Sequence, residues 1–185
     1  IPKAATSGAE EYFENLYEHA DHKALEHWDG ELYFEMHRGT YTSQAANKRY
    51  NRKTEVLLHN LEAMAFLADR FTGENRYPTE ALDRMWQRTL LNQFHDILPG
   101  SSIRQVYEDT TKDYEAIAKE GGELLQTAMD TVCRQVKVSG DSVVILNTTG
   151  FVRSEYVLLP WGENIAHGCG VSDENGSCPC QKTED

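Results

Sequence analysis

Apolar residues recur every three or four positions along the middle of this chain, which is the period of a helix that buries one face. The first such stretch is expected to begin near Thr42-Ser43, where a hydroxyl can cap the first turn, and to end at Thr72-Gly73. Its apolar positions are Leu57, Leu61, Met64, Ala68 and Phe71.

Two further stretches have the same period. The second helix is expected to begin at Pro78, which suits a first turn, and to end at Pro99-Gly100. Its apolar positions are Leu82, Met85, Trp86, Leu90 and Phe94. The third follows Ser101-Ser102, which can cap it, and Gly121-Gly122 weakens its middle and favours a kink there. Its stripe is Ile103, Tyr107, Thr110, Tyr114, Ile117, Gly121, Leu124 and Ala128.

Three long amphipathic helices with short links predict a three-helix bundle, and the flanks predict smaller elements. Residues 8–27 have helical spacing, and residues 31–37 are rich in strand formers and precede a turn at residues 38–40. Residues 142–147 and 151–159 predict two strands joined by a turn. Two strands are not stable alone, so we expect the start of a β-domain here. The predicted fold is mainly α with short flanking strands.

Composition narrows the class of protein. The 185 residues are 39% hydrophobic and 26% charged, which is typical of a globular protein. A net charge of -12 argues against nucleic acid or an anionic membrane surface as a partner. No apolar run reaches the length of a membrane span, and no signal peptide is visible. Because the chain lacks an initiator Met, we expect an internal piece of a longer protein; a processed N-terminus is the alternative.

The four cysteines do not predict a disulfide framework, because Cys133 lies in a helical pattern and the spacing is irregular. Cys178 and Cys180 offer two thiolates, but a structural zinc site usually takes four ligands in two pairs. His167 and Cys169 are the only other candidates nearby. Reduced thiols in a turn are therefore the prediction.

The best candidates for a functional role lie where the second helix is expected to end. His95 is a candidate metal ligand, and the adjacent Asp96 is a candidate sugar-binding or proton-handling carboxylate. A histidine near a helix C-terminus usually serves the helix dipole. Asp96 opposes that dipole, at a cost of roughly a few tenths of a kcal/mol, which favours a functional role.

Asn92-Gln93-Phe94-His95-Asp96-Ile97-Leu98-Pro99-Gly100-Ser101-Ser102 resembles the middle-domain signature of the α-mannosidases of glycoside hydrolase family 38. Residues 30–44 resemble the segment that leaves the catalytic barrel of that family, and residues 144–153 resemble the entry into its β-domain. These stretches occur in the order of the family.

The resemblance implies three regions. Residues 1–41 would be the tail of the catalytic barrel, residues 42–137 the three-helix middle domain, and residues 138–185 the first strands of the C-terminal β-domain. The Pro-Gly-Ser-Ser version of the motif resembles the bacterial, cytosolic and vacuolar branch, which implies a cytoplasmic or vacuolar location.

The resemblance also implies a zinc-dependent retaining glycosidase, in which an aspartate attacks the anomeric carbon and a second carboxylic acid protonates the leaving oxygen. His95 matches the zinc-ligating histidine of the family, and Asp96 matches the aspartate that hydrogen-bonds mannose hydroxyls. His37 lies near the position of an aromatic residue that other branches place beside the sugar, so it implies a hydrogen bond in place of stacking.

No nucleophile or general acid is assigned to this chain. The family places its His-x-Asp pair and its nucleophile in the barrel, and His19-Ala20-Asp21 does not fall at that position. A zinc site requires at least three protein ligands, which a single histidine and a neighbouring aspartate do not supply. We therefore expect the chain to be inactive alone. The implied cofactor is one Zn²⁺ per complete site, and the implied partners are a mannose-containing glycan and the remainder of the parent chain.

Two other hypotheses remain open. A non-enzymatic acidic helical bundle that serves as an interaction module predicts no metal dependence and a tolerant position 95. A small independent metal hydrolase would combine His95 and Asp96 with a carboxylate from elsewhere. Histidine and carboxylate ligands alone do not select zinc over cobalt.

Overall fold

The computed structural model describes residues 3–30, 35–138, 142–159, 171–173 and 175–180. The chain divides into two compact units, Ile1–Val136 and Lys137–Asp185. The assignment of residues 1–41 to a barrel tail and of residues 138–185 to a β-domain stays a prediction. None of the helices in the described residues is long and apolar enough to cross a membrane.

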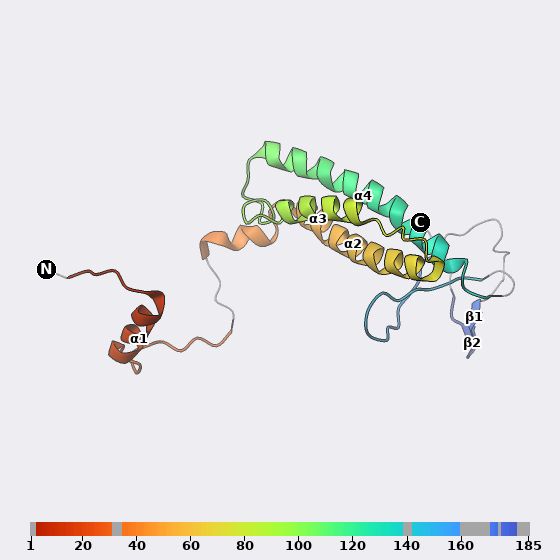
Figure 1. The fold of residues 1–185 in the computed structure, drawn as a ribbon. Coiled ribbons are helices and arrows are strands. Elements are labelled where there is room, and N and C mark those ends of the chain that lie inside the picture. The colour runs from red at the N-terminus through yellow and green to blue at the C-terminus, as the bar shows by residue number, and fades with distance from the viewer. Residues whose placement is uncertain (1–2, 31–34, 139–141, 160–170, 174, 181–185) are drawn as a thin grey trace. The chain divides into compact units, whose positions relative to one another are not determined.

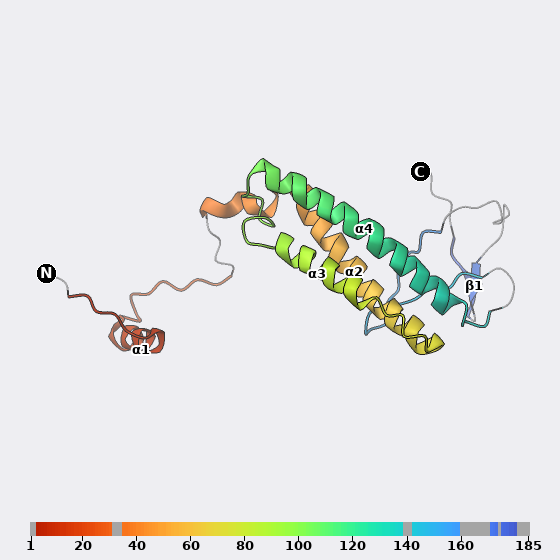
Figure 2. The ribbon, with the colours of Figure 1, turned by 45° about the horizontal axis from the view of Figure 1, so that its top comes forward.

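The first unit contains the expected bundle. Helices α2 (Ala45–Thr72), α3 (Thr79–Asn92) and α4 (Arg104–Cys133) lie side by side, with α3 antiparallel to both neighbours (Figures 1 and 2). Helix α2 ends where the sequence predicted. Gly73 has a φ of 67°, a left-handed conformation that suits glycine, and its N–H donates to the carbonyl of Asp69 at 2.8 Å.

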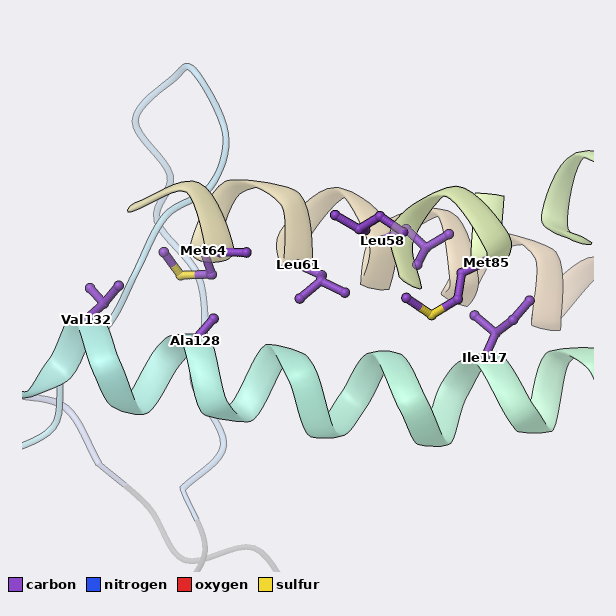
Figure 3. Packing of buried hydrophobic residues seen from close by; sticks show 9 residues of the cluster. Leu58, Leu61, Met64, Met85, Ile117, Ala128 and Val132 are labelled. Atoms are coloured by element: carbon purple, nitrogen blue, oxygen red, sulfur yellow. The ribbon is translucent and has the colours of Figure 1, made fainter. Parts of the chain in front are cut away.

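The three helices enclose an apolar core (Figure 3). Leu58 and Leu61 of α2 are 0% exposed, and Met85 of α3 and Ile117 of α4 pack against the same cluster. Burial of one such side chain stabilises the fold by roughly 1.5–3 kcal/mol. Helix α4 continues without interruption through Gly121, so the predicted weakening there does not break it.

Toward one end of the bundle the buried residues change from apolar to polar. This end holds the start of α2, the end of α3 and the start of α4, and we call its buried polar residues the polar layer. They are Asn47, Asn51, Thr54, Thr89, Asn92 and Thr110. Some of their polar groups are used locally: Gln93 Nε2 donates to Asn51 Oδ1 at 3.0 Å, and Thr89 Oγ1 donates to the Met85 carbonyl at 2.8 Å. Among the described residues, the buried Asn47 Oδ1 and Asn92 Nδ2 have no hydrogen-bond partner.

The predicted hydroxyl caps of α2 and α4 are wrong. Helix α2 begins at Ala45 and is preceded by Gln44, which has a φ of 53° and makes no side-chain cap bond. Helix α4 begins at Arg104, and Ile103 takes the capping position without a side-chain bond. Ser102 lies one position before the capping residue, and its hydroxyl donates to the carbonyl of Asp96 at 2.7 Å.

The predicted end of the second helix is also wrong, because α3 ends at Asn92 and residues 93–100 form consecutive turns. Phe94 N–H donates to the Leu91 carbonyl, and the amides of the next turn bond back to Phe94. Leu90 and Phe94 fit the helical period yet are 59% and 49% exposed. The buried face passes through polar residues at this point, which apolar spacing does not reveal.

The elements before the bundle are shorter than expected. Helix α1 spans Ala9–His19 and has no buried residue, whereas the sequence predicted a helix to residue 27. Residues 31–34 of the predicted strand lie outside the described residues. The rest of that strand and the turn after it form a 3₁₀ segment, η1 (Glu35–Tyr41), with a kink at His37, where φ is -119° and ψ is 15°.

The second unit contains a different hairpin from the one predicted. Strand β1 (Val171–Asp173) pairs antiparallel with β2 (Gly176–Cys178). Residues 142–147 and 151–159 are irregular, although Asn147 Nδ2 donates to the Phe151 carbonyl at 2.7 Å across the turn between them. Val152 is 97% exposed, which suits a strand former that has no neighbouring strand.

Candidate functional site

The link between α3 and α4 carries both His95 and Asp96, and we call residues 93–102 the site turn. His95 Nε2 lies 3.5 Å from Asp96 Oδ2, and their side chains are 77% and 56% exposed. The ring of Phe94 contacts the imidazole with the two centroids 4.1 Å apart. The turn thus presents an imidazole and a carboxylate together, both accessible to a ligand.

Helix α4 holds the backbone of this turn through Tyr107, and Ser102 holds it from within the turn. Ser102 Oγ donates to the Asp96 carbonyl at 2.7 Å, and Ser102 N–H donates to the Tyr107 hydroxyl at 2.9 Å. The same hydroxyl lies 3.4 Å from the carbonyl oxygens of Asp96 and Ile97. The main chain of Asp96 is therefore fixed, whereas the contacts of its carboxylate are long, 3.4 Å to Ser101 Oγ and 3.5 Å to His95 Nε2.

Helix α2 holds the other side of the turn. Asn47 Nδ2 donates to the Ile97 carbonyl at 3.2 Å, and Lys48 Nζ donates to the carbonyls of Leu98 at 2.9 Å and Pro99 at 3.2 Å. A third bond of 2.5 Å joins Lys48 Nζ to the Ser43 carbonyl. Desolvation by burial lowers the pKa of the Lys48 ammonium. Two helices thus hold the backbone that carries the exposed His95 and Asp96 side chains, which is one part of what a preorganised site requires.

The predicted site residues are only partly brought together. His95 and Asp96 are adjacent in space, but they lie in a turn and not in the last turn of a helix as predicted. His37 lies on η1, and its carbonyl accepts a bond of 2.7 Å from Thr40 Oγ1. Among the described residues no three His, Cys, Asp or Glu side chains group together as a metal site, so His37 does not complete one with this pair.

The cysteine prediction concerns the second unit. Cys178 and Cys180 are free thiols, and Cys180 Sγ lies 3.3 Å from the Cys178 carbonyl. His167 and Cys169 lie outside the described residues.

Sequence reasoning missed the residues that hold the turn. Tyr107 was assigned to an apolar stripe, and nothing in the local sequence distinguishes Lys48 from a solvated lysine. A signal did exist for the polar layer. Asn47, Asn51 and Thr54 extend the stripe of Leu58 and Leu61 toward the N-terminus at the same spacing.

The chain was compared with protein families. The family described as "Alpha mannosidase middle domain" matches residues 35–132, which is more than half of the chain and includes the whole site turn. The chain belongs to this family. The resemblance predicted from residues 92–102 is thereby confirmed at the level of the family.

Known α-mannosidases are also similar to this chain. "Alpha-mannosidase 2C1" of Homo sapiens is 36% identical over 160 residues, which cover 86% of this chain and 15% of the relative. "Alpha-mannosidase G" of Dictyostelium discoideum is 42% identical over 132 residues, which cover 71% of this chain and 12% of the relative. "Alpha-mannosidase" of Saccharomyces cerevisiae is 47% identical over 91 residues, which cover 49% of this chain and 8% of the relative. The chain thus spans a small part of the length of these relatives.

A solved structure of a protein in glycosyl hydrolase family 38 from Enterococcus faecalis also aligns with this chain. The TM-score is 0.49 at 24% sequence identity, and the alignment covers 69% of this chain and 14% of the other.

Proposed function

We propose that this chain forms one wall of the active site of a zinc-dependent retaining α-mannosidase, which hydrolyses terminal α-mannosides of glycans. Membership of the α-mannosidase middle domain family supports a hydrolase parent. The observation that carries the proposal is the His95–Asp96 pair, exposed on a turn whose backbone is held by α2 and α4.

In this proposal His95 ligates zinc and Asp96 binds the sugar. An imidazole nitrogen is a common zinc ligand, and a carboxylate accepts several hydrogen bonds, which suits a pair of sugar hydroxyls. The exposed imidazole fits one ligand position, and the other ligands would come from the remainder of the parent chain. When bound, zinc would act as a Lewis acid that helps to hold the sugar. His37 would offer a further hydrogen bond to the substrate.

The two catalytic carboxylates are proposed to lie outside this chain. Retaining glycosidases place them about 5–5.5 Å apart on either side of the scissile bond. We assign neither role to a residue here, and we propose that the chain is inactive alone. The Pro99-Gly100-Ser101-Ser102 motif, similar to that of the cytosolic and vacuolar branch, supports a location in one of those compartments.

The test is His95→Ala in a full-length α-mannosidase that contains this segment, with His59→Ala, an exposed histidine of α2, as the control. Bound zinc is measured by plasma mass spectrometry and kcat/KM with a chromogenic α-mannoside. We expect His95→Ala to lose at least tenfold in metal affinity and in activity, with the control unchanged.

Wild-type zinc content and activity in His95→Ala would reject the proposal and favour the interaction module. Tight stoichiometric zinc binding by the 185-residue chain alone would instead favour an independent metal hydrolase.

A further inference from the structure

We infer that Lys48 is a positioning residue of the proposed active site: its ammonium holds the site turn against the start of α2 and thereby sets the placement of His95 and Asp96. The inference rests on the proposed function of that pair. The experiment below separates the two.

One nitrogen joins two segments that are distant in sequence. Lys48 Nζ lies 2.9 Å from the Leu98 carbonyl oxygen, 3.2 Å from that of Pro99 and 2.5 Å from that of Ser43. An ammonium has three N–H donors and no acceptor, so three carbonyls satisfy it fully. Asn47, the preceding residue, donates to the Ile97 carbonyl. Three successive carbonyls of the site turn therefore accept hydrogen bonds from two adjacent side chains of α2.

The charge of Lys48 is used in an unusual way. None of the ion pairs in the described residues includes Lys48, whereas Lys112 of α4 pairs with Asp109 at 3.0 Å. A half-buried cation loses part of its hydration, and here only backbone dipoles replace it. Hydrogen bonds from a charged donor are stronger than those from a neutral donor. The bonds from Lys48 therefore hold the turn more firmly than bonds from an amide or a hydroxyl would.

The turn that Lys48 holds is short. Leu98 and Pro99 follow Asp96 by two and three residues, and the amides of Ile97 and Leu98 both donate to the Phe94 carbonyl. A shift of the Leu98 carbonyl is therefore transmitted to the residues on either side of His95. A metal ligand displaced by about 1 Å loses much of its value for catalysis.

The variants are Lys48→Met, which removes the ammonium, and Lys48→Arg, which keeps a positive charge and several donors. Lys53→Met is the matched control, because Lys53 is an exposed lysine of the same helix. In the 185-residue chain, hydrogen–deuterium exchange is followed at the amides of Ile97, Leu98 and Gly100. In a full-length α-mannosidase that contains this segment, zinc affinity and the separate values of kcat and KM are measured.

We expect Lys48→Met to accelerate exchange at those amides at least tenfold, while core amides of α4 stay protected. In the full-length enzyme it should weaken zinc binding about tenfold, in the range measured for residues that orient metal ligands, and lower kcat more than it changes KM. Lys48→Arg should recover part of each effect, and Lys53→Met should match the wild type.

Unchanged exchange in the turn of Lys48→Met would overturn the inference, as would faster exchange with wild-type zinc affinity and kcat. Equal acceleration of the core amides would also overturn it, because Lys48 would then be a general stabilising residue. If His95→Ala loses zinc and Lys48→Met does not, only the positioning role fails. If His95→Ala also keeps its zinc, the proposed function fails, and the exchange data still report on the turn.

Discussion

Gly100 lies directly against the backbone of Ser43. A Cβ atom added at Gly100 would stand 2.7 Å from both the Cβ and the carbonyl oxygen of Ser43. The φ of Gly100 is +96°, a conformation that side chains with a Cβ rarely adopt. Two independent reasons therefore require glycine at this point, where the site turn meets the segment that precedes α2.

Replacement of Gly100 by alanine should destabilise the fold. We expect the free energy of unfolding to fall by about 1–3 kcal/mol, because the left-handed backbone and the contact with Ser43 are both opposed. Gly39→Ala is the control, since its Cβ would meet only Ser43 Oγ at an ordinary 3.5 Å. Urea denaturation followed by circular dichroism measures both variants. Equal stability of the two would contradict this account of Gly100.

The adjacent glycines of α4 should respond differently to alanine. A Cβ at Gly122 meets nothing within 4 Å, so helix propensity alone should stabilise Gly122→Ala by about 0.5–1 kcal/mol. A Cβ at Gly121 would stand 3.1 Å from Leu57 Cδ2 and 3.4 Å from Met85 Sδ. Gly121→Ala should therefore be the less stable of the two by thermal denaturation. The reverse order would show that α2 and α3 do not need the space at Gly121.

The exposed pair should matter little for folding. His95→Ala and Asp96→Asn are each expected to change the free energy of unfolding by less than about 0.5 kcal/mol, because neither side chain is buried. Tyr107→Phe removes the acceptor of the Ser102 N–H and should cost about 1 kcal/mol. Chemical denaturation of the 185-residue chain checks all three. A loss above 2 kcal/mol in His95→Ala would mean that the histidine is a structural residue.

The apolar core should be much more sensitive. Leu61 of α2 is 0% exposed in the apolar core, and we expect Leu61→Ala to lower the free energy of unfolding by about 2–5 kcal/mol. Leu67 of the same helix is 37% exposed and should cost clearly less when truncated. The comparison is made from urea midpoints at constant m-value. Similar losses at both positions would indicate that the helices pack on a different face.

Alkaline pH should weaken the bundle through Tyr114. Burial, with smaller contributions from Glu55 and Asp113, raises the pKa of its hydroxyl to about 12 from 10.0. Between these values the unfolded chain loses the proton and the folded chain keeps it, so the free energy of unfolding falls as pH rises. The loss should reach roughly 2–3 kcal/mol near pH 12.

Tyr114→Phe should remove this part of the alkaline loss. The lowered pKa of Lys48 acts in the opposite direction, because burial favours its neutral form in the folded state. The contribution of the tyrosine is therefore taken as the difference in the free energy of unfolding between wild type and Tyr114→Phe. Urea denaturation at pH 9 and above measures it. Parallel curves for the two proteins would contradict the assignment.

Local sequence predicted the bundle because its signals were local. Leu61 and Ile117 lie on the predicted apolar stripes and are buried, and Gly73 ends α2 through its own backbone conformation. The stripe of α2 was wrong in detail, because Phe71 is 57% exposed and the buried residue beside the predicted Leu57 is Leu58. The same spacing placed Phe94 in a helix, although its side chain is half exposed, because periodicity does not record where the neighbouring helices end.

The candidate site was predictable only in part. His95 and Asp96 were identified through a family motif, and the family has since been confirmed. The contact between Lys48 and Leu98 joins residues 50 positions apart, so no local pattern contains it. The strand predictions at residues 142–159 failed because strand formers pair only when a neighbouring strand is present.

The division of the bundle interior into an apolar part and the polar layer has a consequence for evolution. Apolar residues such as Leu61 can be exchanged for others of similar volume with modest loss, provided that the space stays filled. Asn51 has less freedom, because its Oδ1 accepts hydrogen bonds from Gln93 Nε2 at 3.0 Å and from the buried Tyr114 hydroxyl at 3.5 Å, and an apolar replacement would remove both. Homologous chains should therefore drift in sequence at the far end of the bundle while the end beneath the site turn changes slowly.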